Sequence, residues 1–275
     1  MNPIQFSKMS GSGNDFIIID NRDRCVDDLD LSQFITAVCR RKMSVGADGL
    51  ILVEPSEKAD FRWRFFNSDG SRAEMCGNGA RCAARFAFVN GIAGQNLTFE
   101  TDAGIVSGQV SADRAKVKMP DPADLRLDYS IELANGALEV SSINTGVPHV
   151  VIMRDSIDDA DVFNLGREIR NHATYAPAGT NVNFITQRGA GNLAIRTYER
   201  GVEDETLACG TGAIASALVS SAKLGWNSPT NLLTRSAETL TIHFNENDGL
   251  FSDVYLEGDA RIIYTAQLGE DAWQL

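Results

Sequence analysis

Two short segments of the sequence place a cysteine in front of a glycine-rich turn. Residues 75–80 read Met-Cys-Gly-Asn-Gly-Ala and residues 208–213 read Ala-Cys-Gly-Thr-Gly-Ala, so the two cysteines are Cys76 and Cys209. Small, apolar helix formers follow both segments, which predicts that a helix begins behind each cysteine. A sulfur in that place lies beside unpaired N–H groups and the positive end of the helix dipole, and this environment favours the thiolate.

Such a pair of helix starts suits one kind of reaction. The glycines at positions 77, 79, 210 and 212 leave backbone amides uncovered, so each helix start can hold a carboxylate. If the two starts meet at one carboxylate, one sulfur stands on either side of the α-carbon. A thiolate on one face then removes the α-proton, a thiol on the other face returns a proton, and the stereocentre inverts.

Other features recur with the spacing of 133 residues that separates the two cysteines. Gly13 corresponds to Gly146, and each is followed at the same distance by a run of three β-branched apolar residues. Gly46 corresponds to Gly179, again before a strand-like run. A constant spacing across positions more than sixty residues apart predicts two similar halves of one fold.

The elements expected around the cysteines give the fold class. Helices are predicted over residues 80–89 and 213–224, and the second is apolar on nearly every face, as a buried central helix would be. Short strands rich in Val, Ile, Phe and Thr surround them. We therefore expect an α+β fold of two pseudo-symmetric domains, each a mostly antiparallel or mixed sheet wrapped around a central helix. The predicted strands include residues 97–101, 105–110, 115–119, 240–244 and 261–266, and the two prolines within residues 119–122 make that segment the expected linker.

Composition excludes several classes of protein. The chain has 275 residues, 43% of them hydrophobic, which is enough for a sizeable core and rules out disorder. The net charge of −12 repels phosphate backbones and anionic lipid, so nucleic acid is not an expected partner. No apolar run approaches the roughly 20 residues of a membrane span, and the first fifteen residues lack a secretory signal. We expect a cytoplasmic protein that does not bind membranes.

The remaining cysteines and the histidines do not suggest a metal. The five cysteines are odd in number and contain no Cys-x-x-Cys pair, and the three histidines are scattered through the chain. No motif for pyridoxal phosphate, nicotinamide or another cofactor is recognisable. We therefore expect neither a metal nor a cofactor, and inert buried thiols at the other cysteines, which are Cys25, Cys39 and Cys82.

Several motifs together resemble the diaminopimelate epimerase family. Residues 8–16, Lys-Met-Ser-Gly-Ser-Gly-Asn-Asp-Phe, resemble the opening of that family, and both cysteine segments resemble its two cysteine motifs. Residues 66–71, 179–184 and 198–201 fit as well. The resemblance covers most of the chain. It implies interconversion of LL- and meso-diaminopimelate, in lysine and peptidoglycan precursor biosynthesis, by a cofactor-free two-cysteine mechanism. We also expect a homodimer.

By motif position, the resemblance also implies domains and site residues. The first domain comprises residues 1–119 with 263–275, because the last strand returns to it, and carries Cys76; the second comprises residues 120–262 and carries Cys209. His149 is expected to assist one cysteine and Glu199 the other. The expected substrate contacts are Asn14, Asn67, Asn181, Glu199 and Arg200, with the backbone amides of Gly77, Asn78, Gly210 and Thr211 on the reacting carboxylate.

Two positions depart from the family pattern. Val147 stands where relatives typically have asparagine, which removes an expected polar contact to the far end of the substrate. Gly49 stands where many relatives carry glutamine. Neither change touches the two cysteines, but both bear on how tightly the substrate binds and on which substrate is chosen.

Three alternatives remain open. A two-cysteine racemase or epimerase of the proline or hydroxyproline type would be expected to carry a histidine after the first Cys-Gly, where this chain has Asn78. A non-enzymatic or redox protein with exposed thiols would tolerate the loss of either cysteine. An isomerase of the same fold that uses a carboxylate would not need Cys76 and Cys209.

Overall fold

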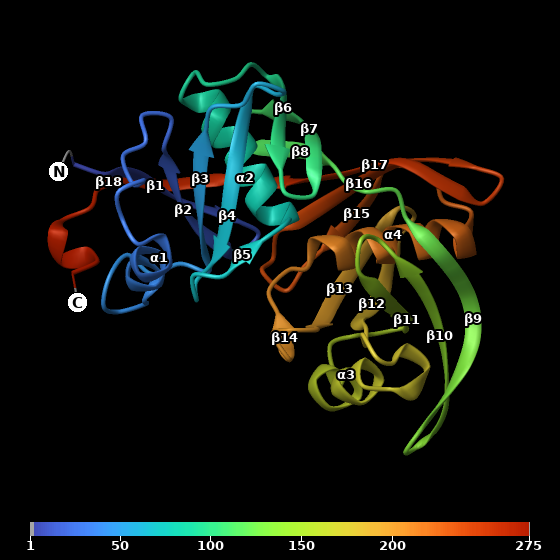
Figure 1. The fold of residues 1–275 in the computed structure, drawn as a ribbon. Coiled ribbons are helices and arrows are strands. Elements are labelled where there is room, and N and C mark those ends of the chain that lie inside the picture. Colours follow the sequence, from blue (N-terminus) through green and yellow to red (C-terminus); the bar gives the residue numbers. More distant parts are fainter. Residues whose placement is uncertain (1–2, 275) are drawn as a thin grey trace. The chain divides into compact units, whose positions relative to one another are not determined.

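The chain divides into two units, Met1–Val117 with Gly258–Leu275 and Lys118–Glu257, and the computed structural model describes residues 3–274. Residues 1, 2 and 275, which lie at the ends of the predicted first domain, are outside the described residues. Each unit is a mixed β-sheet with α-helices (Figure 1). The predicted α+β fold class is therefore confirmed.

In the first unit, neighbouring strands follow the order β18-β1-β2-β3-β4-β6-β7-β8, with the short β5 also beside β4. The pairs β2–β3 and β4–β6 are parallel and the others antiparallel. Its elements are β1 (Gln5–Gly11), β2 (Asn14–Asp20), α1 (Leu31–Cys39), β3 (Gly49–Glu54), β4 (Phe61–Asn67), β5 (Arg72–Ala73), α2 (Gly77–Val89), β6 (Asn96–Thr101), β7 (Gly104–Ser111), β8 (Arg114–Lys118), β18 (Arg261–Gln267) and a 3₁₀ turn, η2 (Glu270–Ala272).

The second unit repeats this plan strand for strand. Its order is β9-β10-β11-β12-β13-β15-β16-β17, with the short β14 beside β13, and the parallel pairs β11–β12 and β13–β15 fall at the same places. The repeat found in the sequence is therefore a repeat of topology. The elements are β9 (Ala123–Leu133), β10 (Gly136–Asn144), β11 (Pro148–Met153), α3 (Val162–Arg170), η1 (Ala173–Tyr175), β12 (Asn181–Gly189), β13 (Asn192–Glu199), β14 (Asp204–Thr206), α4 (Gly210–Leu224), β15 (Thr230–Leu233), β16 (Thr239–Asn247) and β17 (Leu250–Asp259).

The central strands of each sheet are covered on both faces. In the first unit, Ile17 and Ile19 of β2 pack with Phe34 and Val38 of α1. Phe16 faces the other way, toward Gly79 of α2. Successive side chains of a strand point to opposite faces, so the middle of β2, residues 16–19, is apolar and buried on both faces because helices lie on both sides of it. The sequence predicted the central helix, whereas α1 and its counterpart α3 form an outer layer that was not predicted.

The central helices begin earlier than predicted. Residues 80–89 and 213–224 were expected to be helical, but α2 starts at Gly77 and α4 at Gly210. Cys76 and Cys209 are the N-caps, with extended φ angles of −147° and −119°. Glycine has a low helix propensity, so the prediction began each helix after the glycines, whereas the first turn includes them. The helix starts are therefore directly behind the cysteines.

The topology also gathers strand ends at one edge of each sheet. β2 and β3 are parallel and begin at this edge, and β4 runs back and ends there. In the second unit β11 and β12 begin, and β13 ends, at the corresponding edge. Most predicted site residues occupy these strand ends or the helix starts. No helix within residues 3–274 is long and apolar enough to cross a membrane.

Candidate active site

Cys76 caps α2 in the first unit. Its Sγ accepts a hydrogen bond from the N–H of Gly79 at 3.4 Å, and the side chain is half-buried. Gly77 and Asn78 form the first turn, where N–H groups have no intrahelical acceptor. This end of α2 therefore combines a thiol with donors suited to a carboxylate.

Asn14 connects this sulfur to the edge of the sheet. The Cys76 thiol donates to Asn14 Oδ1 at 3.7 Å, and Asn78 Nδ2 donates to the same oxygen at 3.4 Å. On its other side, Asn14 Nδ2 donates to Asp48 Oδ2 at 2.7 Å. Asn14 is thus held in one orientation, with its oxygen toward the cysteine.

Asn67 lies at the end of β4, on the same edge of the first sheet. Its Nδ2 donates to Ser71 Oγ at 3.0 Å, and its backbone pairs with Gly49 at the start of β3. The first unit therefore brings Cys76 and Asn14 together with Gly77 and Asn78, and places Asn67 at the end of β4, two strands from Asn14.

Cys209 caps α4 and touches Glu199. The residue is 8% exposed, and its Sγ lies 3.5 Å from Thr211 Oγ1. Burial raises the pKa of Glu199, and hydrogen bonds from Thr206 and Cys209 to its carboxyl group partly offset that rise. The bond from Thr206 Oγ1 is 2.9 Å long. The second unit therefore couples a thiol directly to a buried carboxyl group.

His149 is buried on β11, and its proton can be assigned from its neighbours. Asn183 accepts from Thr197 Oγ1 at 3.0 Å and donates from Nδ2 to the Val150 carbonyl at 2.9 Å, which fixes the amide. The same Nδ2 faces His149 Nδ1 at 3.1 Å, so this ring nitrogen is the acceptor and Nε2 carries the proton. Burial, together with the positive charge of Arg200, holds the pKa of His149 at about 3, so the ring is neutral at pH 7. Within residues 3–274, its buried Nε2 has no hydrogen-bond partner.

Asn181 and Arg200 are joined at the start of β12. Asn181 Nδ2 donates to the Pro148 carbonyl at 3.2 Å, and its Oδ1 accepts from the backbone N–H of Arg200 at 2.9 Å. The Arg200 guanidinium donates to the Ala178 carbonyl at 3.1 Å, and no carboxylate among the described residues pairs with it. The neighbouring Glu203 is engaged by Arg170 instead. Arg200 thus keeps donors that can meet an anion.

The second unit collects its predicted residues at one sheet edge and one helix start. Cys209, Glu199 and Thr211 are in contact, while His149 reaches them through Asn183, whose Oδ1 lies beside Gly212 of α4. Gly210 is the first residue of α4.

Three residues that hydrogen-bond to the predicted site residues were not predicted from the sequence. Asp48 orients Asn14, Asn183 orients His149, and Thr206 binds Glu199. Asn183 follows Asn181 by two residues, and such residues share a face of a strand, so that spacing was a usable signal. Nothing in the sequence marked Asp48 or Thr206.

The other three cysteines have no such surroundings. Burial raises the pKa of Cys39 and of Cys82 to about 12, and it also raises the pKa of Cys25. All five cysteines are free thiols. In the part of the chain that is described, no three His, Cys, Asp or Glu side chains form a group that could hold a metal.

Gly49, the departure noted in the sequence, has a steric cause. A Cβ atom there would stand 2.6 Å from the Phe66 carbonyl oxygen and 2.8 Å from Phe65 Cε2. Both contacts are far inside van der Waals range, so a longer side chain does not fit this backbone. Val147, the second departure, is half-buried in the loop before His149.

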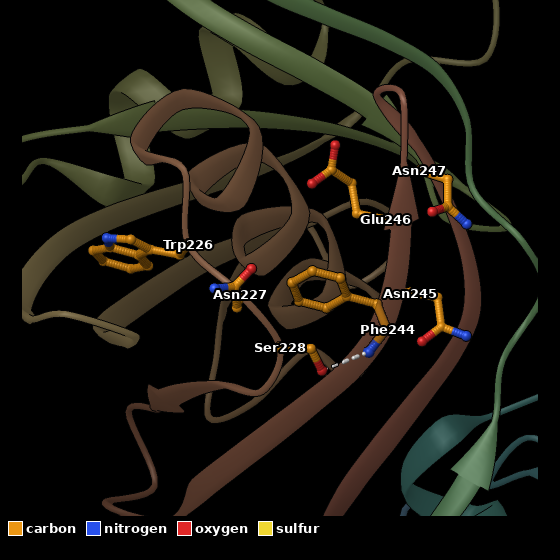
Figure 2. Close-up of a pocket in the computed structure, with 7 residues that line it drawn as sticks. All are labelled: Trp226, Asn227, Ser228, Phe244, Asn245, Glu246 and Asn247. Atoms are coloured by element: carbon orange, nitrogen blue, oxygen red, sulfur yellow. Dashed lines mark hydrogen bonds between the residues drawn. The ribbon is translucent and has the colours of Figure 1, made fainter.

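A pocket of about 350 Å³ lies elsewhere in the second unit (Figure 2). It begins just past the end of α4 and is bordered by β16. Because α4 has 15 residues and a helix rises about 1.5 Å per residue, this end is about 20 Å from Cys209. None of the predicted site residues lines it. The lining residues are Trp226, Asn227, Ser228, Phe244, Asn245, Glu246 and Asn247.

Comparison of the sequence with known proteins shows the family to which it is similar. The sequence profile for diaminopimelate epimerase matches residues 6–124 and 141–263. The diaminopimelate epimerase of Aquifex aeolicus is 44% identical over 282 residues, which cover 98% of this chain and 99% of that protein. The diaminopimelate epimerase of Chlorobaculum tepidum is 43% identical over 261 residues, covering 93% of this chain and 98% of that protein.

Solved structures show the same fold at low identity. A phenazine biosynthesis protein of the PhzF family from Bacillus anthracis superimposes with a TM-score of 0.72 at 16% identity, covering 98% of this chain and all of that one. A probable proline racemase from Agrobacterium radiobacter gives 0.69 at 14% identity, covering 98% of this chain and 94% of that one. At such identity the likeness concerns the fold alone. Given the matching profile and the relatives above 40% identity, the chain belongs to the diaminopimelate epimerase family.

Proposed function

We propose that the chain is an isomerase that epimerises LL-2,6-diaminopimelate to meso-diaminopimelate with Cys76 and Cys209 as an acid–base pair and no cofactor. One observation carries this proposal: each cysteine is the N-cap of the helix at the same position of two units with the same topology. First-turn N–H groups beside each sulfur suit the carboxylate next to the reacting carbon. One thiolate takes the α-proton, the other thiol gives a proton, and the stereocentre inverts.

Glu199 and His149 assist the cysteines in this proposal. Glu199 accepts a hydrogen bond from Cys209, and burial moves its pKa up toward that of a thiol. The closer the two pKa values lie, the less it costs to pass a proton between the groups. The neutral His149 offers its Nε2 proton as a hydrogen-bond donor, because Asn183 occupies Nδ1.

The remaining predicted residues hold the two ends of the substrate. The backbone amides of Gly77, Asn78, Gly210 and Thr211 receive the reacting carboxylate. Arg200 receives the far carboxylate, for which its unpaired guanidinium donors are suited. Asn14 and Asn67, with Asn181 and Glu199, offer oxygens to the ammonium groups.

The two units are the domains of the enzyme in this proposal, with Cys76 in the first and Cys209 in the second. The enzyme acts in the cytoplasm, where thiols stay reduced, and supplies precursors of lysine and peptidoglycan. We further propose a homodimer formed through β18. This strand exposes Ile263 (55%) and Tyr264 (43%), and among the described strands it pairs with β1 alone. The equivalent edge strand β9 is instead protected by charges such as Arg126 and Asp128.

The experiment that tests this function uses dialysed, chelator-treated protein in deuterated water. LL-diaminopimelate should gain α-deuterium and convert to the meso form without any addition. L-Proline and trans-4-hydroxy-L-proline are the control substrates and should remain unchanged. Turnover of a proline substrate, or dependence on an added metal or pyridoxal phosphate, would contradict the proposal.

A further inference from the structure

Arg81 is a buried cation close to the start of α2, where both burial and the helix dipole are unfavourable for a positive charge. Its side chain is fully buried, although removing a guanidinium from water is energetically costly. It also lies only four residues past the first residue of α2, near the positive end of the helix dipole, where cations are unfavourable. A residue kept against two such penalties is expected to have a role beyond filling space.

The hydrogen bonds of Arg81 reach the turn that carries Asn14. Its Nη2 donates to Ser12 Oγ at 3.1 Å, its Nε to the Asp259 backbone carbonyl at 3.3 Å, and its Nη1 to the Gly77 carbonyl at 3.4 Å. Ser12 in turn donates to Asp259 Oδ1 from Oγ at 2.7 Å and from its N–H at 3.0 Å. The network therefore ties the β1–β2 turn to α2.

The turn lies directly on the helix. A Cβ atom at Gly11 would be 3.1 Å from the Asn78 carbonyl oxygen and 3.3 Å from Arg81 Nη2. Ser12 has a left-handed φ of 56°, which its hydrogen bonds to Asp259 help to hold. Two residues later the chain reaches Asn14, whose Oδ1 contacts the Cys76 thiol.

The charge of Arg81 is not cancelled by direct contact with an anion. Its three acceptors are two carbonyls and a hydroxyl, and the Asp259 carboxylate lies behind Ser12, where its other oxygen is 3.4 Å from Arg261. The charged and titratable groups that act on Arg81 are Asp259, Arg114 and the thiols of Cys76 and Cys82. Burial raises the pKa of Cys82 to about 12, so that thiol stays neutral. Beside Asp259, Cys76 is therefore the group among these whose negative form Arg81 can favour.

We propose that Arg81 is a positioning residue for Cys76: it fastens the Gly11–Asn14 turn to the start of α2 and keeps a buried positive charge near the sulfur. Asp259 and Ser12 hold the guanidinium in that place. The inference deepens the proposed function, because it explains how the first cysteine becomes a thiolate. It can also be tested without the substrate.

The test follows alkylation of Cys76 and of Cys209 by iodoacetamide against pH, with each cysteine read from its own peptide by mass spectrometry. Arg81→Met should raise the pH midpoint for Cys76 by about one unit, since loss of a nearby opposite charge shifts a titration by that order. Asp259→Asn keeps the acceptor for Ser12 but removes a negative charge, so the Cys76 midpoint should fall. Arg81→Lys should restore most of the midpoint lost in Arg81→Met.

Arg85 supplies the matched control. It also donates to backbone carbonyls, those of Ala112 at 3.1 Å and Ala260 at 2.6 Å, from the same helix one turn further from Cys76. Arg85→Met should leave the Cys76 midpoint unchanged, and the Cys209 midpoint should be constant in all four variants. Equal Cys76 midpoints in Arg81→Met, Asp259→Asn and the wild type would overturn the proposal.

If Arg81→Met does not fold, the nearly isosteric Asp259→Asn tests the proposal by itself. A lower Cys76 midpoint in this variant would show the effect of charge, because only a charge effect lowers that midpoint. The outcome is independent of the proposed function. A protein that shows these shifts but does not turn over diaminopimelate would refute the function and leave the role of Arg81 intact.

Discussion

Replacing Gly212 by alanine should destabilise the protein, whereas the same change at Gly79, its counterpart in the repeat, should not. A Cβ atom at Gly212 would stand 2.3 Å from Asn183 Oδ1, which already accepts a hydrogen bond from Thr197. Overpacking a core costs about 1–3 kcal/mol, and a buried polar group left without its partner costs about 1–3 kcal/mol more. Alanine regains about 1 kcal/mol of helix propensity. The net loss at Gly212 is therefore about 3 kcal/mol.

At Gly79 the added Cβ would meet side chains rather than a fixed polar atom. Its neighbours are Ile51 Cδ1 at 3.3 Å, Trp63 Cζ3 at 3.4 Å and Phe16 Cε1 at 3.5 Å. Small shifts of these side chains relieve the contact, and the gain in helix propensity offsets the strain. The free energy of unfolding should stay within about 1 kcal/mol of the wild type.

Thermal unfolding of the two variants, followed by circular dichroism, measures the difference. About 2–4 °C per kcal/mol is expected for a chain of this size, so Gly212→Ala should lower Tm by about 6–12 °C and Gly79→Ala by at most a few degrees. Equal Tm values for both variants would contradict this prediction, because they would show that Asn183 is not fixed against α4.

Three further predictions concern single residues. The pKa of His149 is about 3 in the folded protein and 6.5 ordinarily, so below pH 6.5 the unfolded chain binds a proton that the folded protein does not. Between pH 7.5 and 5 the wild type should therefore lose about 2 kcal/mol of unfolding free energy relative to His149→Gln, measured by urea titration. A constant difference between the two proteins would contradict a buried neutral ring. Arg200→Ala should raise KM for diaminopimelate about 10- to 100-fold through loss of a charge-assisted contact while Tm moves by less than about 2 °C, and equal damage to both would indicate a structural role instead. Cys39 and Cys82, with pKa values of about 12 against an ordinary 9.0, should react with iodoacetamide about a thousandfold more slowly than a free thiol at neutral pH, and rapid labelling of either peptide would be inconsistent with their burial.

Most of the fold could be predicted because the repeat is visible as recurring short segments of the sequence. The Cys-Gly-x-Gly-Ala segments and the apolar runs after them recur at 133 residues, and both central helices are found there. The outer helix α1 was harder to predict, because it has only nine residues and its position depends on packing against Ile17 and Ile19.

The partners of the site residues were harder to predict than the residues themselves. Glu199 stands in a motif, but its contact with Thr206 depends on how β13 turns back into β14. The tautomer of His149 depends on Asn183 and, behind it, on Thr197. Such contacts arise from strand register, which a sequence specifies only through the packing of the whole sheet.

In the proposed function, Cys76 and Cys209 act on opposite faces of one α-carbon. The most direct measurement compares wild type, Cys76→Ala, Cys209→Ala and the control Cys25→Ala for conversion of LL- to meso-diaminopimelate in deuterated water. Wild type and Cys25→Ala should form product that carries one α-deuterium. Each of the other two variants should lose about 10²- to 10⁴-fold in conversion, because inversion needs an acceptor on one face and a donor on the other. Near-normal conversion by either Cys76→Ala or Cys209→Ala would contradict the account.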